Sequence, residues 1–400
     1  MAFLNIGIIF CLAAVGYCYL FYPLVIRLLA MWFPRPLSND ESYRPTVSVI
    51  LSVHNEEKVI ERCIDSVLAL DYPRDRLEII IGSDGSTDRT NEILKSYQSL
   101  SPIFRLHLYS EQRGKITVLN DIISLSTGEI LFFIDADIEL APNALAAQVS
   151  HYIDNTIGAV AGSYEIGSAD RSSLFASERE YLTLEQQIRD SESRFYSTVG
   201  LAGCNYTVRR SLWQPLPDTL VHDDLYMVLS VLDKNHRVAF EQRSIATERF
   251  ARTLREEFRR KSRFASRGYH TFAFFPKLIL PRAGRTAFIL WSHKLLRWSS
   301  PFFALTLVGL ATLGFAVTSL LIYKVILICA AVISGFALIG FAAEMAGVSI
   351  PVLRQLSWLF VMNAAYVVGT IKYITRSDEE IWRSSSRGSV HKSHGLGSAL

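Results

Sequence analysis

The chain has 400 residues, half of them hydrophobic, and a formal net charge of +3 at neutral pH. Its positive mean hydropathy of +0.22 argues against an ordinary soluble enzyme of this size. The near balance of acidic and basic side chains gives no indication of nucleic acid as a partner. The 5 cysteines are odd in number and lack disulfide or metal-ligand spacing, which fits a reducing compartment.

Apolar residues are concentrated towards both ends of the chain. Residues 3–33 contain no charged side chain except Arg27, and they are long enough to cross the ~30 Å hydrocarbon core of a bilayer. Three further candidate spans lie at residues 302–323, 325–343 and 356–373. A cleaved signal peptide is the alternative for the first stretch. Arg27, Arg35 and Arg44 favour an uncleaved anchor in the cell (inner) membrane, with the following domain in the cytoplasm.

These features predict five segments along the chain. They are an N-terminal transmembrane anchor (1–34), a cytoplasmic α/β domain (44–272), an amphipathic interface segment (273–299), three candidate transmembrane helices (300–373) and a polar tail (374–400). The amphipathic stretch at 286–298 is expected to lie in the membrane interface or to help form a re-entrant element.

Strands and helices alternate in the first half of the α/β domain. Apolar runs predict strands at 46–53, 77–83, 104–109 and 129–134, and helical spacing predicts helices at 56–70, 88–100 and 116–125. Beyond residue 137 we expect strands at 158–164, 199–208 and 236–241 and helices at 174–195, 223–233 and 253–272. This alternation predicts a doubly wound, mostly parallel sheet.

Two pairs of aspartates close two of the buried strands. Asp84 and Asp88 enclose a Gly-Ser-Thr turn, and Asp135 and Asp137 directly follow the strand at 129–134. Open α/β sheets bind ligands at the carboxyl ends of their strands. Asp135 and Asp137 offer two oxygen ligands to Mg²⁺ or Mn²⁺ and leave the other positions to water and a diphosphate. The pattern therefore predicts a site for a nucleoside diphosphate, although a lone pair of solvated loop acids is the simpler alternative.

Further polar residues are expected at the same edge of the sheet. Asn55 and Glu56 follow the first strand, and Asp84 would accept hydrogen bonds from a base or a ribose. Asp88 belongs to this nucleotide site in the same interpretation, or it only caps the helix that follows. Lys115 follows a glycine at a predicted helix start and could pair with a phosphate, or it could be an ordinary surface lysine.

Asp223 and Asp224 open the helix predicted at 223–233. Two acids at a helix N-terminus can simply cap it. The alternative is a general base that takes the proton from an acceptor hydroxyl, which requires hydrogen-bond reach and an ionised carboxylate.

Four arginines, at positions 255, 259, 263 and 267, share one face of the helix predicted at 253–272. One interpretation is a basic helix on an anionic membrane surface, with Phe258, Phe264 and Phe272 directed towards lipid. The other directs one or two arginines to a diphosphate, whose charge they would stabilise as the nucleotide leaves.

Together, the ordered motifs resemble family 2 of the inverting glycosyltransferases, the membrane-embedded group that includes cellulose, chitin, hyaluronan and poly-N-acetylglucosamine synthases. The motifs are Asn55-Glu56-Glu57, Asp84-Gly85-Ser86-Thr87-Asp88, Arg113-Gly114-Lys115, Asp135-Ala136-Asp137, the run from Gly203 to Arg210, and Asp223-Asp224. The resemblance implies a GT-A fold, a UDP-sugar donor, a glycan or lipid-linked acceptor, and contact with membrane lipid.

The resemblance also implies roles for single residues. Asp84 would contact uracil or ribose, Asp135 and Asp137 would hold the diphosphate and the metal, and Asp224 would be the catalytic base. Asp223 stands where glutamate is usual in the family.

The Gln-x-x-Arg-Trp motif of the family occurs here in altered form, as Arg260-Lys261-Ser262-Arg263-Phe264. The resemblance implies that Arg263, with Arg260 beside it, keeps the diphosphate role, whereas Phe264 lacks the indole donor. Trp382, Arg383 and Arg387 resemble the segment that covers bound UDP in the synthases.

Two questions stay open at the level of the sequence. The altered arginine motif and the single span before the catalytic domain favour one or few transfers over processive polymerisation. The alternative function is a noncatalytic membrane subunit that only binds sugar nucleotides or takes part in export.

Overall fold

The computed structural model describes residues 1–167, 173–201, 203–217, 222–248, 254–346, 348 and 350–375. Its strands are β1 (Val47–Val53), β2 (Leu77–Asp84), β3 (Phe104–Tyr109), β4 (Ile130–Ile134), β5 (Ile138–Leu140), β6 (Ile157–Ile166), β7 (Asn205–Arg209) and β8 (Arg237–Glu248). They form an 8-stranded sheet with the order β3-β2-β1-β4-β7-β6-β8-β5. The helices around the sheet are α3 (Ile60–Leu68), α4 (Thr90–Leu100), α5 (Lys115–Ser124), α6 (Ala144–Val149), α7 (Ser173–Phe195), α8 (Asp223–Asp233) and α9 (Leu254–Phe274).

The first half of the sheet is parallel. β1 pairs in parallel with both β2 and β4, so that Val49 lies opposite Ile79 and Phe132, and β2 pairs in parallel with β3. The carboxyl ends of these four strands therefore meet at one edge of the sheet. β7 pairs antiparallel with β4 and β6, whereas β6 and β8 are again parallel. This arrangement confirms the expected α/β class with a mostly parallel sheet.

Both faces of β1, β2 and β4 are buried, which explains their nearly continuous apolar sequence. Ile50 and Leu131 pack on one face against α5, whereas Val49 and Phe132 pack on the other face against α3. Alternate residues of one strand thus belong to different hydrophobic layers.

Two of the expected elements have different limits in the structure. The helix expected at 56–70 begins only at Ile60, because the backbone N–H groups of Glu56 and Glu57 donate to the side chains of Thr90 and Asp88. Such local bonds compete with helix formation. The strand expected at 199–208 was wrong in its first part, since β7 begins at Asn205.

At the other end of the sheet the strands reach further than expected. β8 extends to Glu248, because it pairs with β6 across a bulge and then with β5. The sequence interpretation did not include β5. Its three residues, Ile138–Leu140, are too short for a periodic pattern to show.

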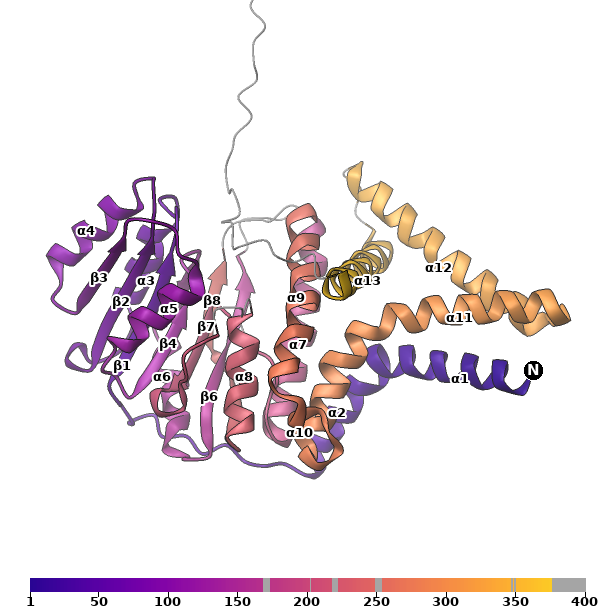
Figure 1. Ribbon diagram of the computed structural model, residues 1–400, viewed down its shortest axis with the longest axis horizontal. Coiled ribbons are helices and arrows are strands. Elements are labelled where there is room, and N and C mark those ends of the chain that lie inside the picture. Colours follow the sequence, from indigo (N-terminus) through magenta and orange to yellow (C-terminus); the bar gives the residue numbers. More distant parts are fainter. Residues whose placement is uncertain are drawn as a thin grey trace, which may run out of the picture.

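The helices outside the sheet domain are α1 (Ala2–Gly16), α2 (Tyr22–Trp32), α10 (Arg285–Leu290), α11 (Leu296–Thr318), α12 (Leu321–Met345) and α13 (Pro351–Thr375). Two π-helical turns, η1 (Tyr17–Phe21) and η7 (Trp291–Leu295), connect α1 to α2 and α10 to α11. Within the described residues, 4 helices are long and apolar enough to cross a membrane. Figure 1 shows the sheet on one side of the molecule and these helices on the other, with α7 and α9 between them.

The stretch expected to be a separate amphipathic segment is part of a longer helix, which runs from Arg285 to Thr318. Its polar side chains point into the protein. His293 lies between two glutamates of α7, with its ring nitrogens 2.6 Å from Glu192 Oε1 and 2.6 Å from Glu185 Oε1. Arg297 donates to the second oxygen of Glu185 at 2.7 Å. The amphipathic pattern therefore reflects docking onto α7.

Helix α9 packs against α13, and its Phe272 is buried against Trp298 of α11. The interpretation in which Phe258, Phe264 and Phe272 face lipid is wrong for Phe272, which is buried. Phe264 stacks on His222. At Gly369 of α13 the two helices approach so closely that an added Cβ would lie 2.4 Å from the Ser262 carbonyl oxygen.

Candidate active site

A lysine joins the ends of two elements at the carboxyl edge of the parallel strands. Lys115 begins α5, and its Nζ lies 3.1 Å from Asp135 Oδ1 and 3.1 Å from Asp223 Oδ2. Asp135 follows β4, and Asp223 begins α8. The structure thus brings together three of the predicted site residues from distant parts of the sequence. Burial opposes protonation of Lys115, but the two carboxylates raise its pKa above its usual value.

Asp84, at the end of β2, holds the loop that leads to Lys115. Its Oδ1 accepts the backbone N–H of Arg113 at 2.6 Å, and its Oδ2 accepts that of Gly114 at 2.8 Å. Asp84 itself is fully buried. The next residue, Gly85, has a φ of +63° and approaches the loop so closely that a Cβ would lie 2.6 Å from Gln112 N. The predicted contact of Asp84 with a base or ribose stays a prediction, and its observed role is to fix this loop.

The other residues predicted on this side of the site build the turn between β2 and α4. Asn55 has a φ of +55°, and its Oδ1 accepts the backbone N–H of Thr87 at 2.8 Å. Asp88 accepts the backbone N–H groups of Glu57 and Thr90. The simpler interpretation of Asp88, a capping residue, accounts for these bonds. The predicted nucleotide contacts of Asn55, Glu56 and Asp88 stay predictions.

The carboxylates at this edge lie close enough to affect one another. Burial raises the pKa of Asp135, and the charges of Asp137 and Asp223 add to this effect against the opposing influence of Lys115. Burial also raises the pKa of Tyr206 on β7, and the nearby charges of Asp223 and Asp224 raise it further. Asp135 therefore lies in surroundings with a shortage of positive charge, which a divalent cation would relieve.

The donor set fits such a cation only in part. Among the described residues, no group of three or more His, Cys, Asp or Glu side chains is arranged to hold a metal ion. Asp135 and Asp137 supply carboxylate oxygens, which are the ligands that Mg²⁺ and Mn²⁺ prefer. The remaining ligands would have to be water and the diphosphate of a substrate.

Asp224 differs from Asp135 in its hydrogen bonds. Burial opposes its ionisation, but His222 and the backbone N–H of Leu225 lower the pKa of Asp224 to about 2. The group is therefore an ionised carboxylate over the whole physiological pH range, as a general base requires.

The arginines of α9 have separate environments. Arg260 forms ion pairs at 2.7 Å with Glu178 and with Glu257, two buried carboxylates, so that its charge is already balanced within the protein. Arg263 is half-buried and lies directly before Phe264, which contacts His222. The predicted diphosphate contacts of Arg260 and Arg263 stay predictions. Trp382, Arg383 and Arg387 lie outside the described residues.

Three residues near Asp224 were not assigned a role in the site from the sequence. His222 bonds to Asp224, Phe264 stacks on His222, and Gly203 leaves space beside Asp224 Oδ2. The available signals were the position of His222 directly before the two aspartates and the replacement of the usual tryptophan by Phe264.

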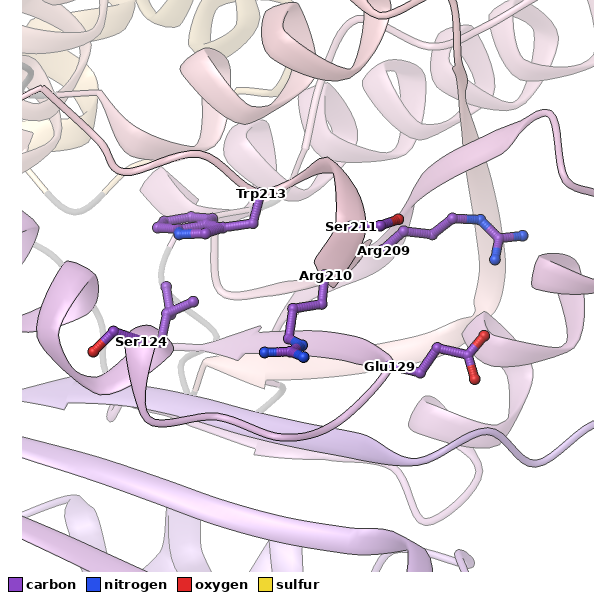
Figure 2. Close-up of a pocket in the computed structure, with 7 residues that line it drawn as sticks. Ser124, Glu129, Arg209, Arg210, Ser211 and Trp213 are labelled. Carbon is purple, nitrogen blue, oxygen red and sulfur yellow. The ribbon is translucent and has the colours of Figure 1, made fainter.

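A pocket of about 400 Å³ lies elsewhere on the sheet domain. Figure 2 shows side chains that line it, among them Glu129, Arg210 and Trp213. Glu129 precedes β4, whereas Asp135 follows it, so the pocket is at the opposite end of this strand from the acidic site. None of the predicted site residues lines it.

Comparison with known proteins is consistent with this geometry. The computed structure resembles that of the mannosyltransferase PcManGT from Pyrobaculum calidifontis, solved in complex with GDP-Man and Mn²⁺, with a TM-score of 0.70 and 24% identity over 94% of this chain and 100% of that one. This similarity confirms the expected GT-A fold. Residues 48–214 match the family described as Glycosyl transferase family 2. This part of the chain is therefore similar to glycosyltransferase domains of family 2.

Two curated relatives show how far the similarity extends. The chain is 26% identical over 234 residues to the probable glycosyltransferase YdaM of Bacillus subtilis (strain 168), which covers 55% of this chain and 54% of the relative. It is 29% identical over 194 residues to the beta-monoglucosyldiacylglycerol synthase of Nostoc sp. (strain PCC 7120), which covers 46% and 41%. The chain thus spans about half the length of these relatives.

Proposed function

We propose that the protein is a membrane glycosyltransferase that moves a sugar from a UDP-sugar to a hydroxyl group of a glycan or a lipid-linked acceptor. The observation that carries this proposal is the link made by Lys115. This residue gathers Asp135 and Asp223 at one edge of the sheet, with Asp224 beside them. An ionised carboxylate, a cation and a pair of potential metal ligands at this edge suit nucleotide-sugar chemistry.

The proposed reaction is a single in-line displacement. Asp224 takes the proton of the acceptor hydroxyl, and the acceptor oxygen attacks the anomeric carbon while the bond to the diphosphate breaks. Arg263 offsets the charge of the leaving diphosphate. An α-linked donor would give a β-linked product, and no nucleophile of the protein is required.

Asp135 and Asp137 are the residues that would hold Mg²⁺ or Mn²⁺. When bound, the ion would neutralise the diphosphate of the donor. Asp84 contributes by holding the loop before Lys115, and this loop lies at the N-terminus of α5, where a phosphate is favoured.

A lipid-linked acceptor fits the way the sheet domain is joined to the apolar helices. α9 packs along α13, and α7 holds His293 and Arg297, so the catalytic edge and the candidate spans form one continuous structure. The name of the Nostoc relative, a synthase of a glycosylated diacylglycerol, agrees with this acceptor class. The arginines after the first span favour an anchor in the cell (inner) membrane, with the catalytic domain on the cytoplasmic side.

The test is turnover by the full chain in nanodiscs with Mn²⁺ and a panel of UDP-glucose, UDP-N-acetylglucosamine, UDP-galactose and GDP-mannose. We expect release of UDP from one of the UDP-sugars. Asp224→Asn should reduce this release by roughly 100-fold or more, because the base is lost, with UDP binding largely retained. Asp233→Asn, the same change at the exposed far end of α8, is the control.

Retained turnover in Asp224→Asn would refute the assignment of the base. Binding of nucleotide sugars without turnover in the wild-type chain would favour the alternative, a noncatalytic membrane subunit. Turnover of GDP-mannose alone would correct the proposed donor.

A further inference from the structure

Among the described residues, the hydrogen bonds to the carboxylate of Asp224 come from one side. His222 Nε2 donates to Asp224 Oδ1 at 2.9 Å, and the backbone N–H of Leu225 donates to the same oxygen at 2.6 Å. The other oxygen, Oδ2, points towards Gly203, where an added Cβ would lie 3.0 Å away. Two bonds to one oxygen fix the plane of the carboxylate and leave Oδ2 on the side that a glycine keeps open.

Among the described residues, the imidazole of His222 hydrogen-bonds through Nε2, to Asp224, and not through Nδ1. Its Nδ1 is buried and has no hydrogen-bond partner among the residues that the structure describes. Burying such a nitrogen without a partner is unfavourable, and packing alone would be served as well by an apolar side chain. The bond to Asp224 therefore accounts for a histidine at this position.

Phe264 fixes the tilt of the imidazole. The rings of His222 and Phe264 are stacked with their centroids 5.3 Å apart and an angle of 5° between their planes. Phe264 lies on α9, which packs closely on α13 at Gly369. A ring stacked on its flat face cannot tilt its plane away from Asp224 without losing this contact.

We propose that His222, held by Phe264, is a positioning residue that fixes Asp224 so that Oδ2 faces the acceptor hydroxyl. The inference rests on the proposed function and names a second residue on which the base depends. A carboxylate that rotates freely spends less time in the reactive orientation, and loss of orientation at a reacting group can reduce the rate by roughly 10- to 100-fold. Substrate binding does not depend on this orientation.

Four variants separate positioning from a general effect on the fold. His222→Leu removes the donor and keeps an apolar side chain, whereas His222→Gln replaces it with an amide N–H that can reach the same oxygen. Phe264→Leu leaves the histidine and removes the stacking. His236→Leu, the same substitution beyond the other end of α8, is the matched control.

The experiment measures kcat for UDP release, KM for the donor, UDP affinity by calorimetry, and Tm, all on the full chain in nanodiscs. We expect His222→Leu to lower kcat by roughly 10- to 100-fold with KM, UDP affinity and Tm near those of the wild type. His222→Gln should recover part of the loss, and Phe264→Leu should lower kcat by a smaller factor. His236→Leu should match the wild type.

Wild-type kcat in His222→Leu would overturn this inference alone, as would an equal loss in the Gln and Leu variants. A wild-type chain without turnover would overturn the inference and the proposed function together. If His222→Leu is unfolded by its Tm, Phe264→Leu decides the matter. A lowered kcat with unchanged KM supports positioning, and either an unchanged kcat or a raised acceptor KM alone overturns it.

Discussion

The carboxylate of Asp84 is a buried acceptor for two backbone N–H groups, those of Arg113 and Gly114. Asp84→Ala leaves both groups unpaired in the interior, where each unpaired group costs about 1–3 kcal/mol. We expect a lowered Tm and weaker UDP binding, because the loop before Lys115 is released. Calorimetry and thermal unfolding in detergent measure both effects. Asp75→Ala, at an exposed position, is the control, and loss of UDP binding with an unchanged Tm would instead indicate direct contact with the nucleotide.

A buried acid on β8 makes the stability of the protein depend on pH. Glu241 is buried on β8, and although burial opposes its ionisation, hydrogen bonds from His151 and Arg243 lower its pKa to about 2. Because the folded pKa lies below the unfolded value of about 4.3, the contribution to stability is complete above that pH and is lost as the pH falls towards 2. The shift corresponds to roughly 3 kcal/mol at most.

We therefore expect the Tm of the wild type to fall between pH 5 and pH 3, and that of Glu241→Gln to fall less, from a lower starting value. Thermal unfolding across this range measures the difference. Glu165→Gln, an exposed position on β6, should lose stability in acid as the wild type does. Equal pH dependence in Glu241→Gln and the wild type would contradict the role of this ion pair.

Among the elements, the contact between α9 and α13 is the closest helix–helix approach described above. Gly369→Ala would place a Cβ 2.4 Å from the Ser262 carbonyl oxygen and 2.8 Å from the Ala265 Cβ. We expect a loss of stability of about 1–3 kcal/mol, which is typical of overpacking, although alanine is the better helix former. Gly335→Ala on α12, where nothing lies within 4 Å of an added Cβ, should be neutral or stabilising. A Tm of Gly369→Ala at or above that of Gly335→Ala would show that the helices can separate without penalty.

The elements also show how far the sequence could predict this protein. Strands β1, β2 and β4 were predictable because both of their faces are buried and their apolar runs are short. The acids after β2 and β4 were predictable as a group, since parallel strands place their carboxyl ends together. The start of α3 and the start of β7 were not. Backbone N–H groups before α3 donate to the side chains of Thr90 and Asp88, and the Val199 N–H before β7 donates to Glu192.

Tertiary pairing also limited the prediction of single side chains. The pattern of four arginines on α9 is visible in the sequence, but the carboxylates of Glu178 and Glu257 that balance Arg260 are not. In the same way, no local signal shows that Phe264 stacks on His222 across two helices. Such contacts arise from the packing of distant elements and require the fold.

At the scale of the whole molecule, the sheet domain and the candidate spans are joined by a buried ionic contact. His293 lies between Glu185 and Glu192, and burial opposes ionisation of Glu185, but His293 and Arg297 lower its pKa well below its usual value. His293→Leu removes the hydrogen-bonding partner that two buried glutamates share, which is expected to cost about 3–5 kcal/mol. Tm in detergent should fall by several degrees. His107→Leu on the edge strand β3 is the control, and equal Tm values for the two variants would contradict this role of His293.

The π-helical turns η1 and η7 lie side by side, joined by a hydrogen bond of 2.8 Å between Tyr17 Oη and Ser292 Oγ, and both helices bend near them in Figure 1. Each such turn accommodates one residue more than an α-helical turn, so the residues on its two sides are out of rotational phase by ~100°. One continuous helix can therefore present both the exposed apolar surface of α1 and the domain-facing Tyr22 in their observed directions. Deleting a single residue between Tyr17 and Phe21 would restore a regular α-helix, and it would rotate one of these surfaces away from its partner. The two turns thus set the angular alignment between the candidate spans and the part of the molecule that holds the sheet.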